Sequence, residues 1–234
     1  MYVSSSWGFE VVQLSYADVE ATLVALNHIS EEKRVAFRAR LKHFQRLGFP
    51  QGANTGTGKR AVYSAKMFIQ LCFAIEFSQM GMTPSRIVQI LNDNWDECEA
   101  SLLFAITPEQ ATSYWSDDIP LSDLAWIFSP EALRDLTLEG EGKFDYKEYI
   151  SVLPIDKIPS IMKEEINYSP VVGEIHRHFI IHLRPFLIRA MELLKYVRPE
   201  FDHMSVFKSL EASVVARQAD LKRFMDHMDG FAKR

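Results

Sequence analysis

Apolar residues recur every three to four positions in four stretches of the first 95 residues, a spacing that predicts amphipathic helices. The four predicted helices cover residues 15–27, 30–47, 64–80 and 83–95. Ser15 is placed to cap the first helix, and Gly48 is placed to end the second. In the second helix, Val35, Leu41 and Phe44 are expected on the side that docks against the rest of the fold.

A glycine-rich stretch separates the second predicted helix from the third. Residues 49–63 (FPQGANTGTGKRAVY) contain turn-forming Gly and Asn, followed by strand-forming residues, and predict a β-hairpin with a basic tip. The stretch is not a phosphate-binding P-loop, because Ala53 stands where that motif needs glycine and Arg60 where it needs Ser or Thr.

Beyond residue 95 the pattern changes. Three short apolar runs, LLFAI (102–106), LAWIF (124–128) and YISVLPI (149–155), predict a small three-stranded sheet. Runs this short also fit a buried helix, so that alternative stays open for each of them. The chain is therefore expected to be mainly helical, with domains at 1–95, 96–165 and 166–234, the middle one a small α+β insert.

The C-terminal region returns to helical spacing. One helix is predicted over 172–197, with a kink at Pro185, and an antiparallel second one over about 205–228. Coiled-coil spacing in the second helix predicts a dimerisation stripe of Phe207, Leu210, Val214, Leu221, Phe224 and Met228. Arg217 is the single polar interruption of this stripe. The alternative is that the stripe packs on the 172–197 helix of the same chain.

Composition permits a buried core and excludes several classes of protein. The chain has 234 residues, of which 47% are hydrophobic, and only two cysteines, which rules out a disulfide scaffold. The longest apolar run is five residues, far short of the roughly 20 that span a membrane. The first residues lack the basic and apolar regions of a signal peptide, so a cytoplasmic protein is expected.

Charge is distributed unevenly along the chain. Residues 30–90 contain ten Lys/Arg and three Asp/Glu, whereas the whole chain has a net charge of −5. Such a basic block favours a face that meets a polyanion, although charge runs are more often only solvated helix faces.

The order of predicted elements (helix, helix, basic hairpin, helix, helix) is typical of a winged helix-turn-helix. In that arrangement the second helix enters the major groove of DNA, and the hairpin contacts neighbouring phosphates. The candidate DNA-binding residues are Arg34, Arg38, Arg40, Lys42, Arg46, Lys59 and Arg60.

The same region, about residues 12–95, resembles the DNA-binding domain of the MerR family. The resemblance rests on LKHFQRLGF (41–49) at the end of the second helix, on Tyr63-Ser64 after the hairpin, and on Met80-Gly81-Met82 before the fourth helix. His43 stands where the family usually carries an aromatic residue, and residues 96–165 replace the long dimerisation helix that normally follows the domain directly.

The resemblance implies a sequence-specific regulator of transcription that is neither an enzyme nor dependent on a cofactor. Its implied partners are double-stranded DNA, a second copy of the chain and, as a further candidate, RNA polymerase, with no membrane. Its implied location is the bacterial cytoplasm, at the nucleoid.

Two other functions stay open. The first is a protein-interaction adaptor that uses the winged helix as a platform. The second is a metal-dependent enzyme that uses Glu174, His178 and His182, spaced four residues apart on the predicted 172–197 helix, because two histidines one turn apart can bind zinc.

Overall fold

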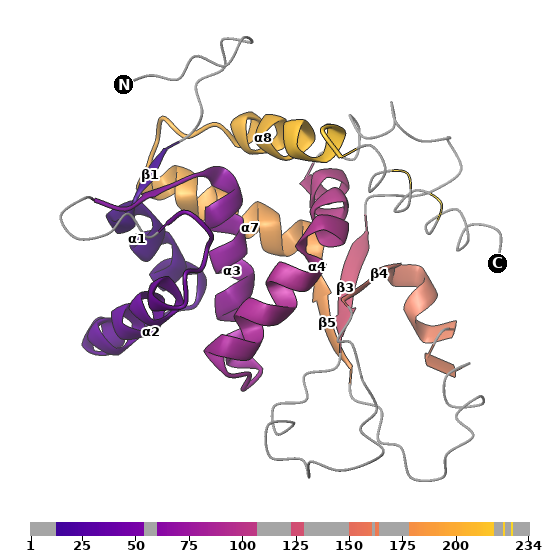
Figure 1. Ribbon diagram of the computed structural model, residues 1–234, viewed down its shortest axis with the longest axis horizontal. Helices are drawn as coiled ribbons and strands as arrows, with labels where there is room; N and C mark the ends of the chain where they lie inside the picture. The colour runs from indigo at the N-terminus through magenta and orange to yellow at the C-terminus, as the bar shows by residue number, and fades with distance from the viewer. Residues whose placement is uncertain are drawn as a thin grey trace.

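The computed structural model describes residues 13–53, 60–106, 123–128, 150–160, 162–163, 178–217, 222 and 226. This part of the chain is mainly helical and contains two small antiparallel sheets (Figure 1). Its elements are β1 (Leu14–Ser15), α1 (Tyr16–Leu26), η1 (Glu31–Lys33), α2 (Arg34–Arg46), β2 (Val62–Tyr63), α3 (Ala65–Gln79), α4 (Pro84–Ile106), β3 (Leu124–Phe128), β4 (Ser151–Pro154), η4 (Ile155–Lys157), β5 (Phe179–His182), α7 (Leu183–Val197) and α8 (His203–Val215).

The four predicted N-terminal helices are present, although the fourth continues to Ile106 instead of ending near residue 95. Local chemistry fixes the ends of the first two. Ser15 caps α1 in a capping box, in which the Asp18 amide donates to Ser15 Oγ at 3.2 Å and the Ser15 amide donates to Asp18 Oδ2 at 2.7 Å. Gly48 ends α2 with a positive φ of 75°, a conformation that glycine adopts without a steric penalty.

Of the β-hairpin expected over 49–63, only the second strand is confirmed, and its partner lies outside that stretch, in front of the first helix. β2 pairs antiparallel with β1, with Leu14 opposite Tyr63 and Ser15 opposite Val62. The segment in front of the first helix is therefore hydrogen-bonded to the segment that leads into α3. Residues 54–59, the predicted basic tip with Lys59, lie outside the described residues.

The second sheet has the strand order β4-β3-β5, with both pairs antiparallel. LAWIF and the SVLP part of the third run form two of its strands, as predicted. The strand prediction for LLFAI was wrong, because residues 102–106 are the last turns of the 23-residue helix α4. These side chains are buried on all sides, which removes the periodicity that separates helix from strand.

The third strand, β5, occupies a segment that was predicted to be helical. The helix α7 begins directly after it at Leu183, so Pro185 lies in the first turn, where its missing amide proton breaks no helical hydrogen bond. The predicted kink was therefore wrong, because Pro185 is at the beginning of a helix. α7 packs against α1 and α4, and Arg198, just beyond its end, forms an ion pair with Asp18 of α1 at 3.5 Å.

One hydrophobic core joins the helices to the inner face of the second sheet. α3 crosses the middle of the molecule (Figure 1), and its Phe73 stacks on Trp126 of β3 with 4.0 Å between ring centroids. Trp126 Nε1 also donates a 2.8 Å hydrogen bond to Ser101 Oγ in α4. The domain boundary predicted after residue 95 falls inside α4, and the core continues across it.

The C-terminal helix α8 packs mainly on α4 and α3 of its own chain (Figure 1). Phe207, Leu210 and Val214 are at most 5% exposed and belong to the main core. These three residues of the predicted dimerisation stripe therefore pack within their own chain, mainly on α4 and α3, and their role in a dimer stays a prediction. Leu221, Phe224 and Met228 lie outside the described residues.

Candidate nucleic-acid interface

The candidate interface is built on α2, which is cationic along its length. From Lys33 to Arg46 the chain has six Lys/Arg and no Asp or Glu. Phe37, Leu41 and Phe44 are 5%, 2% and 0% exposed, and these side chains fix one side of the helix to the core. The helix is therefore rigidly docked, and its other side faces water.

Val35 was expected on the docked side of this helix, and that expectation was wrong. Val35 is 74% exposed, because nine residues separate it from the buried Phe44 and this places the two on opposite sides of the helix. Ala39 and His43 are exposed on the same side of α2. Sequence reasoning did not include these three residues in the site, although an unbroken helical wheel through Phe37, Leu41 and Phe44 would have placed them there.

Four of the predicted residues, Arg34, Arg38, Lys42 and Arg46, follow one another at intervals of four. Each step advances by about 40° around the helix, so the series runs from the flank near α1 to the centre of the exposed side. The exposed fraction of the side chains increases in the same direction. The Arg34 and Arg38 side chains are 28% and 47% exposed, and Lys42 and Arg46 are exposed.

The two cations on the α1 flank are held by a buried carboxylate. Arg38 Nε lies 2.7 Å from Glu20 Oε1, and Arg34 Nη2 lies 3.4 Å from the same oxygen. The Glu20 side chain is only 7% exposed. Arg34 also pairs with Glu31 at 3.0 Å, and the hydrogen bond to Glu31 raises the pKa of the Arg34 guanidinium. Arg34 and Arg38 therefore position α2 against α1 as well as contributing charge.

Glu20 is a part of the site that sequence reasoning missed. The signal was present, because Glu20 is adjacent to Val19 and three residues before Leu23, two apolar positions at helical spacing that predict the docked face. An acid on such a face is rarely buried without a cationic partner.

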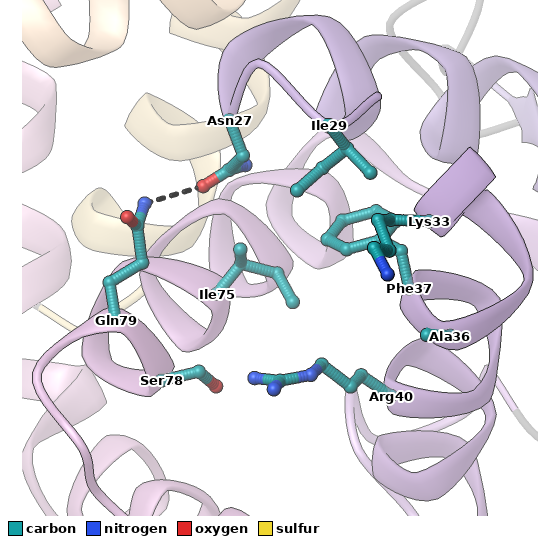
Figure 2. A pocket seen from close by; sticks show the side chains of 9 residues that line it. All are labelled: Asn27, Ile29, Lys33, Ala36, Phe37, Arg40, Ile75, Ser78 and Gln79. Carbon is teal, nitrogen blue, oxygen red and sulfur yellow. Dashed lines mark hydrogen bonds between the residues drawn. The ribbon is translucent and has the colours of Figure 1, made fainter. Parts of the chain in front are cut away.

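The remaining predicted cations are distributed around the helix and beside it. Arg40 lies on the opposite flank from Arg38 and extends toward α3 (Figure 2). Arg60 is exposed two residues before β2. Within the described residues, no ion pair is formed by Arg40, Lys42, Arg46 or Arg60, which leaves their charges free for an anion from outside.

A hydrogen bond fastens the strand β2 to the end of α2. Gln45 Nε2 in the last turn of α2 donates to the hydroxyl of Tyr63. The Tyr63 side chain is buried, and this burial raises the pKa of its hydroxyl. Phe44 and Phe49 pack with 6.1 Å between ring centroids at the same place. The segment that carries Arg60 is therefore tied at one end to the cationic helix.

The histidine site on which the metal-dependent alternative depends is not formed by a helix. His178 immediately precedes β5 and His182 ends it, and roughly 13 Å of extended chain separates them. His182 Nε2 instead lies 3.3 Å from Asp123 Oδ1. No cluster of three or more His, Cys, Asp or Glu suited to a metal ion occurs among the described residues, and Glu174 is not one of these residues.

Comparison of the chain with protein-family models, with curated proteins and with solved structures gave no match. Among the described helices, none combines the length and apolar character needed to cross a membrane. The function is therefore inferred from the surface of the chain itself.

Proposed function

We propose that this chain binds double-stranded DNA in a sequence-specific way and regulates transcription, with α2 as the helix that enters the major groove. The observation that carries the proposal is the composition and docking of α2: six Lys/Arg, no acid, a buried apolar side, and an exposed side centred on Lys42 and Arg46. A cationic helix of this kind fits a major groove about 12 Å wide.

The exposed side of α2 contains the two kinds of group that DNA recognition uses. Lys42 and Arg46 can bond to phosphates or to the acceptor edge of guanine, whereas Val35 and Ala39 offer apolar contact to a thymine methyl group. Arg38 and Arg60, toward the edges of this surface, suit neighbouring phosphates. Binding at phosphates releases counterions and is therefore weakened by salt.

The order of the elements supports a winged-helix version of this function. α1 and α2 are followed by β2 and then by α3 and α4, which is the order expected of a MerR-like domain. A homodimer, a contact with RNA polymerase and a place at the bacterial nucleoid stay predictions.

Fluorescence anisotropy with a random-sequence DNA duplex, between 50 and 200 mM salt, tests the proposal. Six phosphate contacts give a log–log slope of about −5 and an affinity loss of roughly 10³ over that range. The double variant Lys42→Gln with Arg46→Gln is expected to make that slope shallower by about 2 and to weaken binding at least tenfold at 50 mM salt.

The matched control is Arg189→Gln with Lys195→Gln, which removes the same charge from exposed positions of α7. It is expected to change DNA affinity less than twofold. An equal loss in both double variants would show only net-charge attraction and would refute α2 as the interface. If the wild-type chain shows no salt-dependent binding to DNA, the proposed DNA-binding function is refuted and the adaptor function remains. Selection from a random duplex library then defines the specific site.

A further inference from the structure

A cleft of about 350 Å³ lies beside the proposed interface, between α2, the C-terminal half of α3 and the chain that joins α1 to α2. Figure 2 shows its lining: Asn27, Ile29, Lys33, Ala36, Phe37, Arg40, Ile75, Ser78 and Gln79. The residues from α2 are spaced three and four apart, as are those from α3, so each element presents one face to the cleft.

The cleft combines an apolar floor with a cationic rim. Phe37 and Ile75, which are 5% and 3% exposed, form the floor with Ile29. Lys33 and Arg40 stand on the α2 side, and the Arg40 guanidinium points across the opening toward Ser78 (Figure 2). Neither cation has an ion-pair partner among the residues that the structure describes.

The neutral polar groups of the cleft already use most of their hydrogen-bond donors within the protein. Gln79 Nε2 donates to Asn27 Oδ1 at 2.7 Å and to Glu76 Oε2 at 3.4 Å. Asn27 Nδ2 donates to the carbonyl of Leu23 at 2.8 Å, and Ser78 Oγ donates to that of Ala74 at 2.9 Å. The charged donors of the cleft belong to Lys33 and Arg40, and among the neutral groups only one N–H of Asn27 Nδ2 is left beside them.

We propose that this cleft binds a small organic anion: a carboxylate that bonds to Arg40 and Lys33, attached to an apolar body that covers Ile29, Phe37 and Ile75. The size of the cleft falls in the range of small-molecule sites, which are mostly apolar with a few convergent polar groups. The apolar floor distinguishes this ligand from a bare phosphate, because phosphate would leave that floor facing water.

The direct test is a titration of the full chain, without DNA, by methyl NMR with isoleucine labelling. The probes are 2-naphthoate, its neutral analogue 2-naphthamide, and inorganic phosphate. Naphthoate is expected to shift the methyl signals of Ile29 and Ile75 with a dissociation constant below about 1 mM. Naphthamide and phosphate are expected to bind at least about tenfold more weakly, because each lacks one of the two features the cleft recognises.

Substitutions of the two cationic residues test where in the cleft the anion binds. Arg40→Gln and, independently, Lys33→Gln are each expected to weaken naphthoate binding about tenfold, the effect of losing one charge-assisted hydrogen bond. Arg46→Gln, which removes the same charge from the exposed side of α2, is the control and is expected to change binding less than twofold. Equal binding of naphthamide or of phosphate, an equal effect of Arg46→Gln, or unshifted Ile29 and Ile75 signals would each overturn the proposal.

A regulatory consequence rests on the proposed DNA-binding function. Because Arg40 and Lys33 belong to the basic block, an anion in the cleft neutralises charge beside the proposed interface and is expected to weaken DNA binding about two- to fivefold at 50 mM salt. Unchanged DNA affinity with a saturated cleft would refute this regulation. Absence of all DNA binding would refute the proposed function, whereas the naphthoate titration, made without DNA, stands separately.

Discussion

Glu20 and Glu99 are both buried carboxylates that hold two cations, but the cations come from different distances along the chain. Glu20 binds Arg34 and Arg38, which are 14 and 18 residues away and four apart on one helix. Glu99 in α4, with 0% side-chain exposure, binds Lys66 of α3 at 3.1 Å and Arg217, which follows α8 and is 118 residues away.

The two arrangements therefore stabilise different parts of the fold. Glu20 fixes one helix against its neighbour, and its cations keep 28% and 47% of their side-chain surface in water. Glu99 connects three helices, because Ser213 of α8 also donates to it at 2.8 Å. Asp96, one turn earlier in α4, binds Arg217 as well. The deeper carboxylate therefore holds the C-terminal helix in place, whereas the shallower one orients the cationic face.

The largest effect is expected from Glu99→Ala. Removing a buried carboxylate leaves Lys66 and Arg217 without their shared partner in a mostly buried site, which costs about 3 kcal/mol of unfolding free energy. Urea denaturation monitored by circular dichroism measures this. The control, Glu192→Ala, removes an exposed acid 3.7 Å from Arg189 and is expected to cost less than about 0.5 kcal/mol. Similar losses in the two variants would contradict the role of Glu99.

Arg217→Leu is expected to destabilise the fold by about 1–2 kcal/mol, because Glu99 keeps Lys66 and Ser213 but loses its closest cation. The coiled-coil pattern alone predicts the opposite sign, since leucine would complete an apolar stripe. A thermal melt distinguishes the two. A higher melting temperature in the variant would favour the coiled coil and refute the ion pair.

Glu20→Gln is expected to cost about 1 kcal/mol, because Arg34 and Arg38 can turn into water when their partner loses its charge. It is also expected to strengthen random-sequence DNA binding at low salt and to steepen the salt slope by up to about 2, because two guanidinium groups become available to phosphates. Anisotropy titrations check this, with Glu192→Gln as the charge-matched control. A slope unchanged from that control would show that Arg34 and Arg38 lie outside the interface.

Glu76 differs from both of these carboxylates, because it is half-buried and no ion pair is formed by it within the described residues. Burial raises the pKa of its carboxyl above the ordinary value. The folded state then binds the proton more tightly than the unfolded state, so this group adds stability as the pH falls through its raised pKa.

Glu76→Gln is accordingly expected to raise the melting temperature at pH 7 by about 1–3 °C and to lose that advantage below about pH 4, where the wild-type carboxyl is protonated. Melts across this pH range measure the difference between the two proteins. A constant difference at all pH values would indicate an effect of shape and not of charge.

Local signals predicted the first four helices well, because each has its own cap or glycine stop. Ser15, Gly48 and Ser64 act over a few residues and need no tertiary information. The secondary-structure predictions were wrong where a segment is buried on all sides or where pairing with a distant segment determines its conformation. LLFAI has no polar side to reveal a helix, and β5 is a strand because β3 offers it a hydrogen-bonding edge.

The candidate interface was predicted in its charge but not in its geometry. The count of Lys and Arg identified α2, and the interval of four grouped Arg34, Arg38, Lys42 and Arg46 correctly along the helix. The interval could not show that Glu20 binds the first two, because that acid belongs to another helix. Neither could it show that Arg40 turns toward α3 and enters a cleft.

The direct junction between β5 and α7 connects the second sheet to the N-terminal helices. With no loop between His182 and Leu183, the 15-residue helix α7 is a stiff rod of about 22 Å whose one end is continuous with the sheet. Its other end is fastened to α1 by the ion pair of Arg198 with Asp18, and α1 carries Glu20. The second sheet and the helix whose Glu20 holds Arg34 and Arg38 are therefore connected through a single helix with no intervening loop.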